Sequence, residues 1–293
     1  MHITIAQQNT ARKTEHLIAL VSTEKEIPSD QFSKEEMSYI RKEMKDKKKQ
    51  IVINQYKRLA IVQVLTNADA TDYANMEASR KAGATLCARV NAAKANHVTI
   101  SSSLKNEVVL AFAEGLALSN YQFLKYKTKA SSEKNSLKTI GIHHKAITKS
   151  EIDYLKAVCT AVYKSRDLVN EPPNFLTAVE LGNQFMKMGK EAGFSVTVLD
   201  KEEITKMKMG GLLSVNLGSI EPPTFTIMEY KPANAVNKKP YVLVGKGVVY
   251  DTGGMSLKPT PNSMDSMKCD MAGGAAVGGA MYAIAKAKLP VHV

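Results

Sequence analysis

Several features are missing from this sequence of 293 residues, and each absence narrows what the protein can be. No stretch approaches 18 consecutive apolar residues, so no segment is predicted to span a membrane. The first residues, MHITIAQQNT, lack the basic start and long apolar core of a signal peptide and indicate a short strand. Only three scattered cysteines occur, Cys87, Cys159 and Cys269, with no CxxC pair and no disulfide framework. We therefore expect a cytoplasmic protein in a reducing compartment, with its cysteines as small buried hydrophobic residues.

Three common site motifs are absent as well. The sequence contains neither a GxGxxG nor a GxxxxGK[ST] phosphate loop, and HExxH is missing, which excludes a zinc site of that helical type. Hydrophobic residues make up 44% of the chain and charged residues 23%, the balance of a globular protein. The length is sufficient for one large or two ordinary domains.

Positive charge is concentrated in the first half of the chain. The net charge is +12, and residues 1–150 hold 24 Lys and Arg against 14 Asp and Glu. The densest run, residues 41–49, reads RKEMKDKKK. It could bind nucleic acid or another polyanion, but the interspersed Glu43 and Asp46 favour an ordinary solvated helix face.

Short apolar runs alternate with helical patterns in the first half, which is typical of an α/β domain with a largely parallel or mixed sheet. We assign this domain to residues 1–148. The expected strands are 3–6, 16–21, 51–53, 59–64, 97–100 and 137–142, and the expected helices are 33–48, 73–96 and 105–121.

A long helix is expected to connect this domain to a second one. Residues 149–170 show apolar spacing of helical period, Ser150 can cap the start, and Pro172 and Pro173 stop the helix. The second domain is assigned to residues 171–293. Its expected helices are 177–192, 201–208 and 271–288, and its expected strands are 195–199, 224–230 and 241–244.

The residues best suited to chemistry follow the apolar run 241–244, which reads as a strand buried on both faces. Lys246 comes directly after it, and loss of hydration there is expected to lower the pKa of its amine, so that the neutral form can bind a metal. Asp251, Lys258 and Asp270 come next, the last ahead of a glycine-rich helix that must pack tightly. Singly, such residues are usually surface groups. Together, carboxylates converging among glycines suit divalent cations, and one carboxylate can bridge two ions.

Two strings in this region resemble the leucyl aminopeptidases, cytosolic metallo-exopeptidases: VGKGVVYDTGGMSLKP at 244–259 and MDSMKCDMAGGAAV at 264–277. RDLVNEPPNFLT at 166–177 and MGGLLSVNLGSIEPP at 209–223 are similar to other parts of the same family. The resemblance implies a macro-like N-terminal α/β domain, followed by the first half of an α/β aminopeptidase catalytic domain.

Matched by position, the resemblance implies a role for each site residue. Lys246 corresponds to a ligand of one zinc ion, Asp251 to the carboxylate that bridges both ions, and Asp270 to a second ligand of the lysine-bound ion. Lys258 corresponds to the catalytic lysine that stabilises the oxyanion, and Met267 to a residue that lines the pocket for the first side chain. All five would contact the substrate.

The implied reaction releases N-terminal residues, leucine-like ones preferentially, from peptides. It uses two divalent ions, Zn²⁺ or Mn²⁺, with bicarbonate as a general base, and the family assembles as homohexamers of full-length chains.

Two departures from the family pattern matter. The step from Lys258 to Asp270 is twelve residues, one more than usual, and the extra residue lies in loop 260–263. The family's NTDAEGR motif, which supplies an Asp and a Glu for the metals and an Arg for bicarbonate, does not occur in the chain. We therefore expect exposed apolar surface and no turnover by these 293 residues alone. The alternative is an inactive homologue that serves as a binding or structural module, possibly for nucleic acid.

Overall fold

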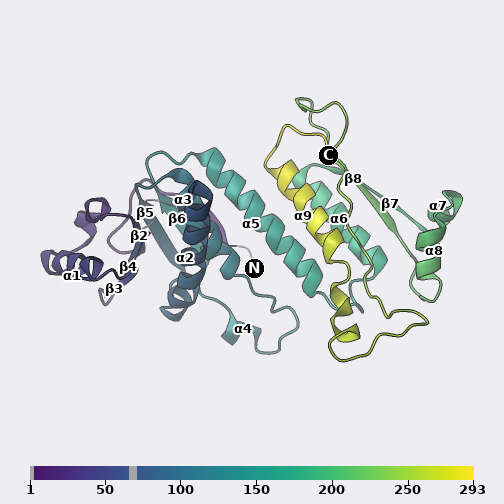
Figure 1. Cartoon of the computed structure of the whole chain (residues 1–293), viewed down its shortest axis with the longest axis horizontal. Coiled ribbons are helices and arrows are strands. Elements are labelled where there is room, and N and C mark those ends of the chain that lie inside the picture. The colour runs from purple at the N-terminus through teal and green to yellow at the C-terminus, as the bar shows by residue number, and fades with distance from the viewer. Residues whose placement is uncertain (1–2, 66–70) are drawn as a thin grey trace. The chain divides into compact units, whose positions relative to one another are not determined.

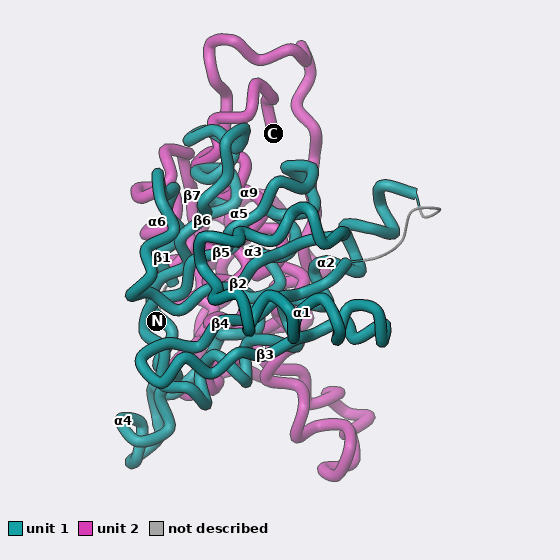
Figure 2. The backbone as a smooth tube through the Cα atoms, turned by 90° about the vertical axis from the view of Figure 1, so that its left-hand side faces the viewer, with its two compact units in different colours: residues 1–159 teal, residues 160–293 magenta. Residues whose placement is uncertain are grey.

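The computed structural model describes residues 3–65 and 71–293 (Figure 1). The chain divides into two compact units, residues 1–159 and residues 160–293 (Figure 2), and the boundary falls within α5 (Lys149–Asn170). The division into domains at residues 148 and 171 stays a prediction. In the described part of the chain, no helix is both long and apolar enough to cross a membrane.

Unit 1 contains a six-stranded sheet with the strand order β1-β6-β5-β2-β4-β3. All neighbouring strands are parallel except β3, which pairs with β4 in the antiparallel sense at one edge. This arrangement confirms the predicted α/β class. The strands are β1 (Thr4–Gln7), β2 (His16–Val21), β3 (Gln50–Asn54), β4 (Leu59–Val64), β5 (His97–Ser102) and β6 (Thr139–His143).

The sequence of β2, HLIALV, explains why the sheet has a core on each face. Successive side chains of a strand point to opposite faces, so Ile18 and Leu20 enter one buried cluster while Leu17, Ala19 and Val21 enter the other. The first cluster includes residues of α2 and α3, and the second includes residues of α1. The helices of unit 1 are α1 (Lys34–Lys45), α2 (Asp72–Ala92), α3 (Asn106–Ser119) and α4 (Ala130–Glu133), with short 3₁₀ turns η1 (Glu24–Glu26) and η2 (Ser29–Gln31).

The prediction that Ser150 caps the start of α5 is wrong. Thr148, not Ser150, caps this helix: its Oγ1 accepts a hydrogen bond from the backbone N–H of Glu151 at 3.3 Å. The Glu151 carboxylate in turn accepts from the backbone N–H of Thr148 at 2.8 Å. This reciprocal pair is a capping box, and the sequence TKSE contains its Thr and Glu three residues apart.

The basic run lies at the end of α1 and in the turn before β3. Arg41, Lys42, Lys45, Lys47 and Lys49 are exposed. Lys48 pairs with the buried Glu43. The run therefore includes a solvated helix face with internal pairing, as the sequence favoured, and nucleic-acid binding there stays the alternative that was not favoured.

His16 makes the stability of unit 1 sensitive to pH. Its Nδ1 accepts a hydrogen bond from the backbone N–H of Leu59 at 2.9 Å. Burial, and then the charges of His97 and Arg58, hold the pKa of His16 below its ordinary value of 6.5. The neutral ring therefore stabilises the folded state fully above pH 6.5, and this contribution is lost as pH falls toward the lower folded-state pKa.

We expect the free energy of unfolding of unit 1, measured by urea denaturation, to fall as the pH is lowered below 6.5. His16→Asn keeps an acceptor close to the position of Nδ1 but cannot titrate, so this variant should lose less stability over the same range. An equal pH dependence in both proteins would contradict the assignment.

Unit 2 packs helices against a two-stranded antiparallel sheet of β7 (Ser195–Leu199) and β8 (Phe225–Glu229). Its core contains Leu181 and Phe185 of α6 (Ala178–Ala192) and Met281 and Tyr282 of α9 (Ala272–Lys286). The remaining elements are α7 (Lys201–Lys206), α8 (Gly210–Asn216) and the 3₁₀ helix η3 (Met264–Cys269).

Tight packing of the glycine-rich helix is confirmed. A Cβ atom added to Gly278 would lie 2.2 Å from a ring carbon of Phe185, and one added to Gly279 would lie 2.1 Å from Oγ of Ser165. Any larger side chain at these positions would separate α9 from α6 and α5.

The prediction that residues 241–244 form a strand buried on both faces is wrong. These residues belong to no strand, and Val242 and Val244 are 78% and 89% exposed. The backbone N–H of Tyr241 donates to the carbonyl of His292 at 3.0 Å, and Tyr230 and Val293 exchange two backbone hydrogen bonds. Residues 291–293 thus lie between the end of β8 and Tyr241, but the segment beyond Tyr241 pairs with no described strand.

Candidate metal centre

Close backbone contact places Lys246 beside the start of α9. A Cβ atom on Gly245 would lie 2.6 Å from the carbonyl oxygen of Gly273, so only glycine allows this approach. The backbone N–H of Gly274 donates to the carbonyl of Lys246 at 2.7 Å. Since Asp270 lies just ahead of α9, this contact brings the two side chains together.

Lys246 and Asp270 form an ion pair, with 2.9 Å between Nζ and Oδ1. The Lys246 side chain is 57% exposed, whereas that of Asp270 is 15% exposed. The hydrogen bond to Asp270 raises the pKa of Lys246 above its ordinary value. The predicted lowering of this pKa is therefore wrong, because Lys246 does not follow a buried strand and has a carboxylate partner.

Asp251 and Lys258 form a second ion pair, with 2.6 Å between Oδ2 and Nζ. The other oxygen of Asp251 accepts a hydrogen bond from the backbone N–H of Gly253 at 2.8 Å. Gly253 has a φ of +88°, a left-handed conformation that favours glycine and turns the chain back toward Lys258. The Lys258 and Gly253 hydrogen bonds lower the pKa of Asp251, which is therefore an anion at neutral pH.

Met267 contacts the second pair. Its sulfur lies 3.1 Å from Nζ of Lys258 and accepts a hydrogen bond from it. The ammonium of Lys258 is thus held between the Asp251 carboxylate and the thioether of Met267.

The two ion pairs are electrostatic neighbours, since the negative charge of Asp251 also raises the pKa of Lys246. Within residues 3–65 and 71–293, no three His, Cys, Asp or Glu side chains cluster closely enough to hold a metal ion by themselves. A cation here would therefore be held by the two carboxylates together with the lysine amine.

One atom indicates that a cation fits. Oδ2 of Asp270 is buried and accepts no hydrogen bond from any residue that the structure describes. An unsatisfied buried polar atom costs about 1–3 kcal/mol, and more when it is charged. A divalent cation bound to this oxygen would compensate that cost, and carboxylate oxygen suits such ions.

Two contacts near the centre were not predicted. The hydroxyl of Tyr250 donates to the carbonyl of Met264 at 3.0 Å, and Nζ of Lys268 donates to the carbonyl of Asn170 at 3.1 Å. The only signal for either residue in the sequence is its position next to Asp251 or Met267.

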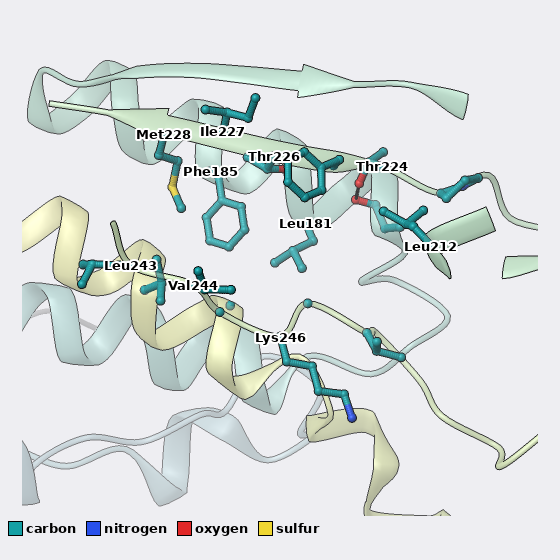
Figure 3. Close-up of a pocket in the computed structure, with 18 of the residues that line it drawn as sticks. Leu181, Phe185, Leu212, Thr224, Thr226, Ile227, Met228, Leu243, Val244 and Lys246 are labelled. Carbon is teal, nitrogen blue, oxygen red and sulfur yellow. Dashed lines mark hydrogen bonds between the residues drawn. The ribbon is translucent and has the colours of Figure 1, made fainter. Parts of the chain in front are cut away.

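An apolar groove of about 980 Å³ lies beside the centre, between β8 and residues 240–250 (Figure 3). Leu181 and Phe185 of α6 line it together with Ile227 of β8 and Val244. Lys246 lies at its margin, with the ammonium directed away from Phe185 and Leu181 (Figure 3). The groove matches the expectation of exposed apolar surface.

Gly245→Ala is expected to destabilise unit 2 by about 1–3 kcal/mol, because the added methyl group meets backbone atoms of Gly273 and Gly274. It should also shift the NMR signals of Lys246. Gly247→Ala is the matched control, since its Cβ would meet only Leu181, at 3.9 Å. Equal stability of the two variants in urea denaturation would contradict the close approach.

Two protein-family models and curated proteins match this chain. The model for the catalytic domain of the cytosol aminopeptidase family matches residues 163–293, and the model for the N-terminal domain of that family matches residues 65–130. A probable cytosol aminopeptidase of Chlorobium limicola is 38% identical over 239 residues, which are 73% of this chain and 46% of that protein. The chain spans less than half the length of such curated relatives.

Solved structures agree in fold. A tomato leucine aminopeptidase mutant matches 99% of this chain and 61% of its own chain, with a TM-score of 0.75 and 23% identity. The bottromycin maturation enzyme BotP in complex with Mn matches 94% of this chain and 57% of its own, with a TM-score of 0.72 and 24% identity.

The two family models lie in the two units in the order that the resemblance implied, and together they take in more than half of the residues. The chain belongs to the cytosol aminopeptidase family.

Proposed function

We propose that this chain is part of a metal-dependent aminopeptidase that releases N-terminal residues, leucine-like ones preferentially, from peptides. The observation that carries the proposal is the grouping of Lys246, Asp251 and Asp270, with one buried carboxylate oxygen left without a partner. The alternative of a purely structural module has no comparable observation in its favour.

Asp270, Asp251 and the amine of Lys246 would hold the divalent ions. Zn²⁺ and Mn²⁺ both accept such nitrogen and oxygen donors, and the related BotP structure is a complex with Mn. When bound, the ions would anchor the free α-amine of the substrate and supply an activated water. Only the neutral amine of Lys246 can serve as a ligand, so metal binding would release its proton to solvent and would replace the ion pair with Asp270.

Lys258 is proposed as the catalytic residue that polarises the scissile carbonyl. Its ammonium would donate a hydrogen bond to the carbonyl oxygen and stabilise the negative charge that develops there. Met267 already contacts this ammonium and is proposed to contact the first side chain of the substrate, to which a thioether offers a soft apolar surface.

Peptides are the proposed substrates, and the names of the relatives support a cytoplasmic location. A homohexamer is proposed for the assembled protein. Exposed apolar side chains such as Val215, Leu217 and Ile220 are compatible with cover by further protein.

Hydrolysis of leucyl p-nitroanilide tests the proposed reaction. The assay compares this substrate with its N-acetylated form, with Mn²⁺ or Zn²⁺ added, on the longest product of the gene that carries this sequence. Cleavage of the free amine substrate alone, abolished by a chelator, is the expected result. Equal cleavage of the acetylated substrate, or no cleavage with either metal, would overturn the proposal.

A further inference from the structure

The 3₁₀ helix η3 carries part of the centre but has little packing of its own. It contains Met267, which contacts Lys258, and it leads directly into Asp270, whose backbone N–H donates to the carbonyl of Met267 at 3.1 Å. None of its six residues is buried. Full burial therefore does not fix its position, so its polar contacts contribute to holding it.

One end of η3 is tied to the segment that carries Asp251. The hydroxyl of Tyr250 donates to the carbonyl of Met264, the first residue of η3, at 3.0 Å. Since Tyr250 precedes Asp251 directly, this bond couples the start of η3 to the second ion pair.

The other end is tied to α5. Nζ of Lys268 donates to the backbone carbonyl of Asn170, the last residue of α5, at 3.1 Å. The final carbonyls of a helix lack intrahelical partners and carry the negative end of the helix dipole, so a lysine ammonium is favoured there. The contact joins residues 98 positions apart. It therefore links η3 to the end of a long helix that is distant from it in sequence.

We propose that Lys268 is a positioning residue of the metal centre: its bond to the end of α5 holds η3 so that Asp270 and Met267 face Lys246 and Lys258. Met271, fully buried, fixes the start of α9, and Tyr250 ties the start of η3 to the segment that carries Asp251. Lys268 adds the contact that joins the other end of η3 to α5. This inference rests on the proposed metal site.

A purely electrostatic role and a positioning role of Lys268 predict opposite changes in the affinity for Mn²⁺ when this lysine is replaced. Lys268→Met deletes a positive charge close to a cation site, which by charge alone should strengthen binding of Mn²⁺. Loss of the anchor should weaken it, because Asp270 is then less well placed. The sign of the change therefore distinguishes the two effects.

The test is titration of Mn²⁺ into the chain, followed by calorimetry or by the EPR signal of free Mn²⁺. Loss of a group that orients a ligand typically lowers metal affinity 10–100-fold, so we expect about a tenfold loss for Lys268→Met. Lys268→Arg keeps a donor and the charge, and should bind Mn²⁺ within about threefold of wild type by the same reasoning.

Lys286→Met is the matched control. Nζ of Lys286 donates to the carbonyl of Glu191 near the end of α6 at 3.2 Å, the same kind of contact, but it lies near the far end of α9 from η3. This variant should leave the affinity unchanged. Melting temperatures of all variants within about 2 °C of wild type would exclude general unfolding as the cause.

Affinity in Lys268→Met equal to or tighter than wild type would overturn the positioning role. If wild type itself binds no Mn²⁺, the proposed metal site fails instead, so the two failures are distinguishable.

Discussion

Asp251→Asn is expected to lower the affinity of this chain for Mn²⁺ about 100-fold or more, since loss of even an orienting neighbour costs 10–100-fold. Asp251 is proposed as a metal ligand, and its carboxylate is ionised because Lys258 and the N–H of Gly253 stabilise the anion. The amide of Asn is neutral and offers one oxygen in place of two. Isothermal titration calorimetry with Mn²⁺ measures the effect directly.

Asp265→Asn provides the control for this prediction. Asp265 is an exposed acid of η3, close in sequence to Asp270, and the substitution changes the net charge by the same amount. It should reduce the affinity by no more than about twofold, as expected for a screened surface charge. Equal losses in the two variants would mean that only overall charge matters and that Asp251 is no ligand.

Gly115→Ala is expected to destabilise unit 1 by about 3 kcal/mol, at the upper end of the usual cost of overpacking. A Cβ atom at Gly115 of α3 would lie 1.9 Å from the backbone carbonyl oxygen of Arg80 in α2, and one at Gly83 of α2 would lie 2.1 Å from that of Phe112. The two helices cross at these glycines, and neither backbone can move without opening the buried cluster around Phe112. Urea denaturation measures the loss.

Gly141→Ala, in the same unit, is the control for Gly115→Ala. Its Cβ would also meet a neighbour at 2.4 Å, but the neighbour is the end of the Gln8 side chain, which can move once it gives up its hydrogen bonds to His97 and Thr99. We expect a cost of about 1–2 kcal/mol, the net contribution of such hydrogen bonds. A Gly115→Ala loss as small as this would show that α2 and α3 are not in backbone contact.

The spacing of apolar residues and the positions of prolines in the sequence were sufficient to predict most of the helices and strands. Alternation within HLIALV and the two prolines after Asn170 each act over a few residues, so they can be read locally. The glycines of α9 likewise predicted tight packing, because a helix tolerates so many only where a neighbour excludes side chains.

The solvent exposure of residues 241–246 could not be predicted from the local sequence. An apolar run is buried on both faces only if strands and helices cover it, and that depends on distant segments. Val242 and Val244 lie exposed, so Lys246 keeps its hydration and its charge. The predicted direction of its pKa shift depended on burial and is wrong for that reason.

Which lysine of the centre pairs with which aspartate could not be predicted from the sequence either. Spacing placed Lys246, Asp251, Lys258 and Asp270 in one region, but the choice of partners depends on the turn at Gly253 and on contact between Gly245 and α9. The anchor from Lys268 to Asn170 spans 98 positions and leaves no local pattern.

Anomalous diffraction from crystals of this chain grown with Mn²⁺ tests the metal centre most directly. We predict a manganese peak at about 2.0–2.2 Å from oxygens of both Asp251 and Asp270, with the amine of Lys246 turned toward it. Manganese bound elsewhere, or these carboxylates still paired only with Lys258 and Lys246 under saturating Mn²⁺, would contradict the account.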